Sequence, residues 1–380
     1  MTRTSSALLL IAGSVFVTLL LSEVGLRLVG FDATPVVAPD PLRGWSLAPN
    51  MPNMTNSLGM RDRKRSVSKP VGTYRIAVLG DSMTEGVQVE LDETFPAVLE
   101  RRLNENSCFG RRPVEVLNFA VQGYGTAQQY LTLQHHVWGF DPDLLMLGFF
   151  PGNDVRDNSR TLKGSAYLPF YDLGDDGKLI LDTSFREHWS YRVRTLGANI
   201  IRYSRLAQMG NQIRFKLKAR LRASSDQEAT KAAGLGEVGV DNLVFAAPPP
   251  PAWEHAWQLT GALIAQMNKD AQTHGTPFHL AILGTATETH PDPAIPAALA
   301  AAVGVEDLSY PRSRLTALGQ ANDFAVLDLV TPLGKLAAQK QECLHGEPGA
   351  SPCSGHFTVA GHAALAQHLA AHLCPAGKVP

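Results

Sequence analysis

Short apolar segments alternate with helical patterns along much of this 380-residue chain. Residues 74–79 (YRIAVL), 114–119 (VEVLNF) and 144–149 (LLMLGF) are runs typical of buried strands. Helical patterns follow the first two runs, at residues 94–106 and 126–138. A strand, a crossover helix and a second strand form a parallel, right-handed unit. The alternation therefore predicts an α/β domain with a parallel, doubly wound sheet.

The alternation stops near residue 158 and resumes later in the chain. Helical patterns cover residues 253–274 and 358–373, and the strand-like runs 278–283 and 324–329 lie between them. We therefore assign residues 71–157 and 253–374 to one domain, preceded by a Pro- and Asn-rich, extended lead-in at 31–70.

Residues 158–252 are predicted to be an insertion, helical at first and then a Pro-rich linker. Within it, residues 187–222 carry nine Lys or Arg against one acid, Glu187, a local net charge of 9 − 1 = +8. Two interpretations stay open: a lid that also faces an anionic membrane or polysaccharide, or a helical cap whose basic residues form its solvated face.

The N-terminus predicts the compartment. Residues Ala7 to Leu21 form an apolar run of 15, preceded by Arg3 and followed by Glu23. The length of this run lies between that of a signal-peptide core and that of a membrane span, which needs about 20 residues. We interpret residues 1–30 as an uncleaved signal anchor that places the rest outside the cytoplasm, periplasmic or extracellular; secretion after signal cleavage is the alternative.

Composition excludes several classes. The chain has 34 Lys+Arg and 35 Asp+Glu, a net charge of −1, which argues against a nucleic-acid partner. Four cysteines are too few for a disulfide scaffold. No cysteine or carboxylate lies at ligand spacing from the histidines, so we expect no metal and no other cofactor.

Reactive and small residues follow the predicted strands. Ser82 comes directly after the first strand, Gly123 lies in the loop after the second, and Asn153 follows the third. His356 lies just before the last helix. The carboxyl ends of parallel strands are where α/β sheets place reactive groups.

Serine, glycine, asparagine and histidine in this order resemble the SGNH hydrolases, also called GDSL-type esterases. The segment 56–62 (NSLGMRD) is similar to members of that family as well. The resemblance covers about residues 56–157 and 253–374 and implies a flavodoxin-like, three-layer α/β/α sandwich. It implies Ser82 as nucleophile, Gly123 and Asn153 as oxyanion donors with the backbone N–H of Ser82, and His356 as general base.

One position departs from the family pattern. The family usually has an aspartate three residues before the histidine, where this chain has Cys353. Glu347, Asp328 or a backbone carbonyl would then orient His356, and we favour the carbonyl because Asp328 has an evident structural role.

An exported chain can pair its cysteines. We expect a Cys343–Cys353 bond in the loop before His356. A flavodoxin-like strand order would bring the ends of the first and last helices together and allow Cys108–Cys374. Four free thiols are the alternative.

The expected activity is hydrolysis of acetyl or short-chain acyl esters, on a carbohydrate or lipid, through an acyl-Ser82 intermediate. The alternatives are an O-acyltransferase acting on an exported polysaccharide and a non-catalytic binding module. The substrate, the acyl chain and the oligomeric state are not predicted by the sequence.

Overall fold

The structure is a computed structural model, and it describes residues 3–110, 112–218, 237, 239–347 and 353–374. The chain divides into two compact units. The first unit comprises Met1–Asp40 and Arg186–Gly234, and the second comprises Pro41–Phe185 and Leu235–Pro380.

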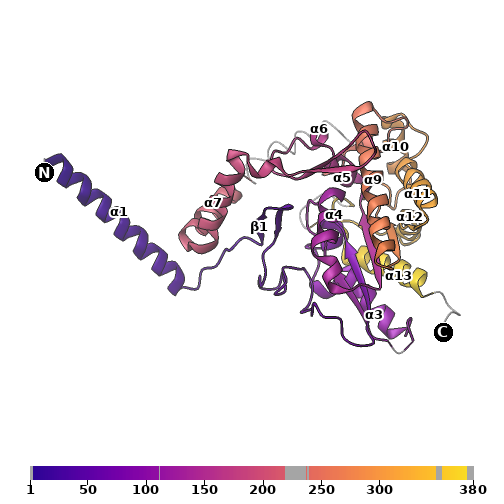
Figure 1. Cartoon of the computed structure of the whole chain (residues 1–380), viewed down its shortest axis with the longest axis horizontal. Coiled ribbons are helices and arrows are strands. Elements are labelled where there is room, and N and C mark those ends of the chain that lie inside the picture. The colour runs from indigo at the N-terminus through magenta and orange to yellow at the C-terminus, as the bar shows by residue number, and fades with distance from the viewer. Residues whose placement is uncertain (1–2, 111, 219–236, 238, 348–352, 375–380) are drawn as a thin grey trace. The chain divides into compact units, whose positions relative to one another are not determined.

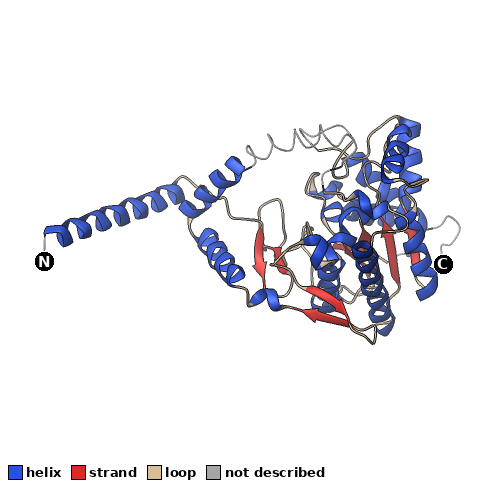
Figure 2. Ribbon diagram, turned by 90° about the horizontal axis from the view of Figure 1, so that it is seen from above, coloured by secondary structure: helices blue, strands red, loops and turns tan. Residues whose placement is uncertain are grey.

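A five-stranded parallel sheet forms the centre of the second unit (Figure 2). Its strands are, in chain order, β3 (Tyr74–Leu79), β4 (Val114–Asn118), β5 (Leu144–Phe149), β8 (Phe278–Ile282) and β9 (Ala325–Asp328). Their spatial order is β4-β3-β5-β8-β9, so the chain starts inside the sheet and extends first to one edge and then to the other. This order confirms the predicted flavodoxin-like sheet.

Helices cover both faces of this sheet. Successive residues of β3 point to opposite sides, so Ile76 and Val78 belong to one core cluster, and Ala77 and Leu79 to another. The first cluster includes residues of α3 (Phe95–Glu105), α12 (Val330–Lys340) and α13 (Val359–Leu373). The second includes α4 (Thr126–His135), α9 (Pro251–Thr273), α10 (Ala294–Val303) and α11 (Tyr310–Asn322), several of which are labelled in Figure 1. The result is the predicted three-layer sandwich.

The second unit also contains shorter elements. They are β2 (Gly44–Leu47), α2 (Ser82–Glu85), η1 (Leu91–Glu93), η2 (Val137–Phe140), α5 (Pro151–Asn158), α6 (Arg160–Lys163), β6 (Phe170–Leu173), β7 (Leu179–Asp182), η3 (Ser184–Arg186, whose last residue is in the first unit) and η4 (Asn242–Phe245).

The inserted segment is not wholly helical. Strands β6 and β7 pair antiparallel, and a tight turn joins them, in which the N–H of Gly174 donates to the carbonyl of Lys178. The sequence GDDGK between them is a hairpin signal. Residues 158–185, the first part of the predicted insertion, belong to the second unit.

The first unit contains α1 (Arg3–Leu28), β1 (Val37–Asp40), α7 (Trp189–Tyr203) and a helix over residues 205–218. Residues 219–236 and 238, which include much of the predicted Pro-rich linker, lie outside the described residues.

Two disulfides join the pairs named in the sequence analysis, Cys108–Cys374 and Cys343–Cys353. Cys108 follows α3 and Cys374 ends α13, and these two helices contact each other on one face of the sheet. The bond therefore ties the beginning of the second unit's α/β sandwich to its end.

Replacing both Cys108 and Cys374 with serine is expected to lower the free energy of unfolding by about 2–4 kcal/mol, because the bond spans 266 residues and constrains the unfolded chain. Guanidinium unfolding followed by circular dichroism measures the effect. An unchanged midpoint would contradict a stabilising role for this bond.

Candidate active site

Ser82 is the first residue of the short helix α2, which follows β3 after two residues. Asp81 caps this helix, since its Oδ1 accepts from the N–H of Met83 at 2.9 Å, and Gly86 ends it in the left-handed conformation. A Cβ at Gly80 would collide with the side chain of Thr84, so glycine is required there for packing. The tight turn thus holds Ser82 at the carboxyl end of the central strands.

His356 lies beside this serine. Its Nε2 is 2.9 Å from Ser82 Oγ, and its Nδ1 contacts Oε1 of Glu347. Serine, imidazole and carboxylate therefore form a continuous chain of hydrogen bonds. In such a chain the imidazole can take the hydroxyl proton while the carboxylate fixes its tautomer and stabilises the imidazolium.

Contacts between the segments 343–347 and 353–357 bring Glu347 to His356. The N–H of Gly346 donates to the carbonyl of His356 at 2.9 Å, and the Cys343–Cys353 disulfide joins the two segments. His345 and Phe357 also form an antiparallel bridge, so Glu347 and His356 are held close together.

The buried side chain of His345 contacts the residues on both sides of His356. Burial lowers the pKa of His345 to about 4, so its ring is neutral at physiological pH. Its Nδ1 is 2.9 Å from the carbonyl oxygen of Gly355, so in this tautomer the Nδ1–H donates to that oxygen. Phe357 packs on the imidazole at a centroid distance of 4.0 Å. Both residues that flank His356 are thus held in place.

The preference for a backbone carbonyl as the partner of His356 was wrong. Glu347, one of the two carboxylates considered, takes that position. Asp328 has the structural role that was anticipated for it: its Oδ1 accepts from the N–H of Val330, at the start of α12, and its Oδ2 accepts from the hydroxyl of Thr331.

Asn153 lies in the first turn of α5 and points toward the same turn as Ser82. Its Nδ2 donates to Oδ2 of Asp81 at 3.1 Å. A carboxylate can only accept hydrogen bonds, so the NH₂ end of the amide must face Asp81. The same nitrogen carries a second N–H, which can donate to another acceptor. Asp81 therefore positions the amide of Asn153, a role that the sequence analysis missed.

Gly123 lies in the loop after β4 with φ +77°, a conformation that favours glycine. A Cβ at this position would lie 3.3 Å from the ring of Trp45. The indole Nε1–H of Trp45 donates to the carbonyl of Gln122 at 3.1 Å, and the hydroxyl of Tyr124 donates to the carbonyl of Trp45. Trp45 thus lies against the loop from the lead-in segment, another contribution that the sequence analysis missed.

A buried carboxylate supports the opposite side of this loop. Glu85 in α2 accepts from the N–H of Gln122. Burial raises the pKa of Glu85 to about 7. Burial also raises the pKa of Asp81 above its usual range. The turn that carries Ser82 therefore holds two carboxylates whose charge is disfavoured by burial and supported by specific N–H donors.

Two residues of the lead-in segment 56–62 contact the elements that carry the site. Buried Arg61 donates from its Nη2 to the carbonyls of Gly86 and Val89. Asp62 accepts from the N–H of Asn118, at the end of β4. The segment therefore braces the end of the serine-bearing helix α2 and the strand that leads to Gly123.

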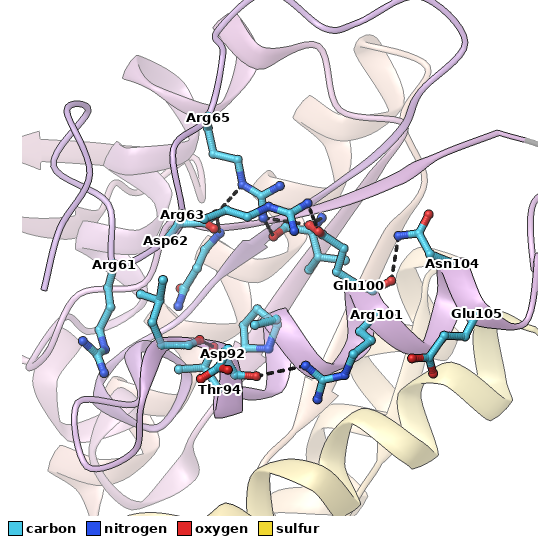
Figure 3. Close-up of a pocket in the computed structure, with 15 residues that line it drawn as sticks. Arg61, Asp62, Arg63, Arg65, Asp92, Thr94, Glu100, Arg101, Asn104 and Glu105 are labelled. Carbon is cyan, nitrogen blue, oxygen red and sulfur yellow. Dashed lines mark hydrogen bonds and ion pairs between the residues drawn. The ribbon is translucent and has the colours of Figure 1, made fainter. Parts of the chain in front are cut away.

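A cavity of about 410 Å³ lies next to this segment, between it and α3 (Figure 3). Ion pairs run through its walls: Arg65 pairs with Asp62 and with Glu100, and Arg63 also pairs with Glu100. Ser82 and His356 are not among its lining residues. Its charged groups neutralise one another, so we assign it a structural role.

No family model matches the chain, and no curated protein matches it. Solved structures similar to it include the acetyl xylan esterase AlAXEase, with 10% identity and a TM-score of 0.40, covering 78% of this chain and 97% of that one. TesA has 12% identity and a TM-score of 0.38, covering 79% and 98%. A catalytic mutant of Axe2, an acetylxylan esterase from Geobacillus stearothermophilus, has 11% identity and a TM-score of 0.41, covering 81% and 97%.

At these identities and TM-scores the likeness says nothing about the substrate of this chain. The sequence blocks around Ser82, Gly123, Asn153 and His356, together with the order of the five strands, resemble the SGNH hydrolases.

Proposed function

We propose that the chain is an SGNH-type serine esterase that hydrolyses acetyl or other short acyl esters on a carbohydrate or lipid. The observation that carries the proposal is the 2.9 Å contact between Ser82 Oγ and His356 Nε2, with Glu347 on the other ring nitrogen. A non-catalytic descendant of such an enzyme would have no need to keep these three groups aligned.

The reaction follows from this geometry. His356 Nε2 takes the hydroxyl proton as Ser82 Oγ attacks the ester carbonyl carbon. The oxyanion that forms is held by the backbone N–H groups of Ser82 and Gly123 and by the Asn153 amide. His356 then passes the proton to the departing alcohol, which leaves an acyl-Ser82 ester. Water, deprotonated by His356, attacks the carbonyl carbon of that ester. His356 then returns the proton to Ser82 Oγ as the acyl–Oγ bond breaks, which releases the acid and the free serine.

Hydrolysis of p-nitrophenyl acetate by the full chain tests the proposal. We expect a rate above the buffer rate that depends on His356. The proposal would be contradicted if the full chain were folded, as judged by circular dichroism, and hydrolysed no acetyl, butyryl or glycan acetyl ester. Adding a polysaccharide acceptor and measuring acyl-glycan formation separates the acyltransferase alternative, which uses the same residues.

Replacing Asn153 with alanine is expected to lower turnover by about 10²–10³, the typical cost of one oxyanion donor. The KM should change less than kcat, because the donor acts mainly on the developing charge. Stopped assays on the purified variant, with folding checked by circular dichroism, measure the loss. Asn199→Ala, at an exposed position of α7, is the matched control. An unchanged rate for Asn153→Ala would remove that residue from the oxyanion site.

We also propose that α1 anchors the chain to a membrane and that the second unit lies outside the cytoplasm. The residues Ala7–Leu28 form a helix with mean hydropathy 2.2, none of which is buried, long and apolar enough to cross a membrane. Both disulfides belong to the second unit, as suits an oxidising compartment. Protease digestion of intact and opened spheroplasts tests this placement: resistance of the second unit in spheroplasts whose membrane is intact would contradict it.

A further inference from the structure

The helix α7 presents its apolar stripe outward. Trp189, Val193, Leu196, Ile200 and Tyr203 recur every three or four residues, so they lie along one face of the helix. The exposed fraction of each exceeds half, from 53% for Ile200 to 73% for Tyr203. The other face contains the less exposed positions Ser190, Gly197, Ala198 and Ile201. Among the residues that the structure describes, the large apolar side chains of this face have no partner that covers them.

The same region is strongly basic. Residues 187–222 have the net charge of +8 given above, and Arg192, Arg202, Arg214 and Lys216 are among the exposed cations of α7 and the helix that follows it. An outward apolar stripe accompanied by exposed Arg and Lys is the composition of helices that lie in the headgroup region of anionic bilayers.

Hydrogen bonds fasten α7 to the end of the candidate membrane helix. The carboxylate of Glu23, near the C-terminal end of α1, accepts from the Ser204 hydroxyl and from the N–H groups of Arg205 and Leu206. Arg27 donates to the carbonyl of Tyr203 at 2.8 Å. Glu23 thereby caps the helix over residues 205–218, at the point where α7 ends. All these groups belong to the first unit.

This attachment holds the C-terminal end of α7 at the end of the anchor. Charged Glu23 and Arg27 occupy the last turns of the span Ala7–Leu28, so they mark the interface between hydrocarbon and water. Ser204, which follows the last residue of α7, is hydrogen-bonded to Glu23 at that interface. The C-terminal end of the apolar stripe therefore lies close to the end of the candidate membrane span.

We propose that α7 is an interfacial helix whose stripe of Trp189, Val193, Leu196, Ile200 and Tyr203 inserts into the headgroup region of an anionic membrane, next to the α1 anchor. The inference rests on the proposed anchor and is independent of the esterase reaction. The membrane, rather than a second copy of the chain, is the occupant because hydrogen bonds join the C-terminal end of α7 to the candidate membrane helix and because exposed cations accompany the stripe.

Trp189 provides the probe. The full chain is reconstituted in vesicles of phosphatidylcholine and phosphatidylglycerol, with or without bromine on the acyl chains close to the headgroup. The emission of Trp189 is obtained as the difference between the wild type and Trp189→Phe, since Trp45, Trp138, Trp253 and Trp257 remain in both. We expect brominated lipid to quench most of this emission, and to quench it less in vesicles of phosphatidylcholine alone.

The double variant Leu196→Glu, Ile200→Glu is expected to abolish the quenching. Both side chains are more than half exposed, so the fold should not change. Val71→Glu, at a fully exposed position of the second unit, is the matched control and should quench like the wild type. The Ser82→Ala variant should also quench like the wild type, which separates this inference from the proposed reaction.

The overturning results are distinct. A chain that floats with the vesicles but whose Trp189 emission is not quenched contradicts the interfacial helix and leaves the anchor in place. Unquenched Trp189 with cross-links between α7 helices of two chains assigns the stripe to a second copy. A chain that does not float with the vesicles contradicts the anchor and the interfacial helix together.

Discussion

Replacing Ser82 with alanine is expected to reduce ester hydrolysis by several orders of magnitude, to a residual rate supplied by the oxyanion donors and by substrate binding. The hydroxyl is the only group of the site that can form the acyl intermediate proposed here, and His356 Nε2 lies 2.9 Å from it. The initial rate with p-nitrophenyl acetate measures the loss.

Ser354→Ala is a useful control for this substitution, because it changes a hydroxyl two residues from His356 without touching the proposed nucleophile. It should retain activity within about tenfold. If Ser82→Ala kept the wild-type rate, the esterase reaction would have to run on another group.

Replacing Glu347 with glutamine is expected to lower kcat by up to about 10⁴, as when the triad carboxylate of a serine protease becomes an amide. The amide keeps the volume of Glu347 but loses the charge that stabilises the imidazolium of His356.

The control for this variant is Glu342→Gln, which alters an exposed carboxylate just before Cys343, in the same stretch of chain. It should leave kcat within about twofold. A loss of less than tenfold in Glu347→Gln, with normal circular dichroism, would contradict a catalytic role for this carboxylate. It would instead favour a serine–histidine dyad in which a backbone carbonyl orients His356.

The strands and helices of the sheet could be predicted from local pattern. Strands β3 and β5 have the bounds expected from their apolar runs, and the helices α3, α9 and α13 begin and end within about two residues of those expected. Helix α4 begins at the expected residue and ends three residues earlier than expected. The strands are short apolar runs buried along almost their whole length, and the helices carry their apolar residues at helical spacing, so the local pattern predicts both kinds of element.

The partner of His356 could not be predicted in this way. Its identity depends on contacts between the segments 343–347 and 353–357, which the Cys343–Cys353 bond and the Gly346–His356 hydrogen bond join. No periodicity encodes such contacts. The cysteine pairing was the available signal, since a bond between positions ten apart brings the residues beside it close to the histidine.

The contacts that the lead-in segment makes with the site could not be predicted, for a related reason. Trp45 and Arg61 make their contacts with residues that are distant in the sequence, Gln122 for the first and Gly86 for the second. A Pro-rich segment without periodicity gives no indication of what it packs against. Only the three-dimensional structure relates these side chains to the loop of Gly123 and to the turn of Ser82.

The most direct test of the central claim is covalent labelling of the full chain with a fluorophosphonate, followed by peptide mapping in a mass spectrometer. The reagent reacts with a serine that is activated by a neighbouring base, so its adduct identifies the nucleophile. The account predicts one adduct, on the peptide that contains Ser82, and its loss in His356→Ala. An adduct on a different residue, or a fully folded chain that hydrolyses esters without labelling Ser82, would contradict it.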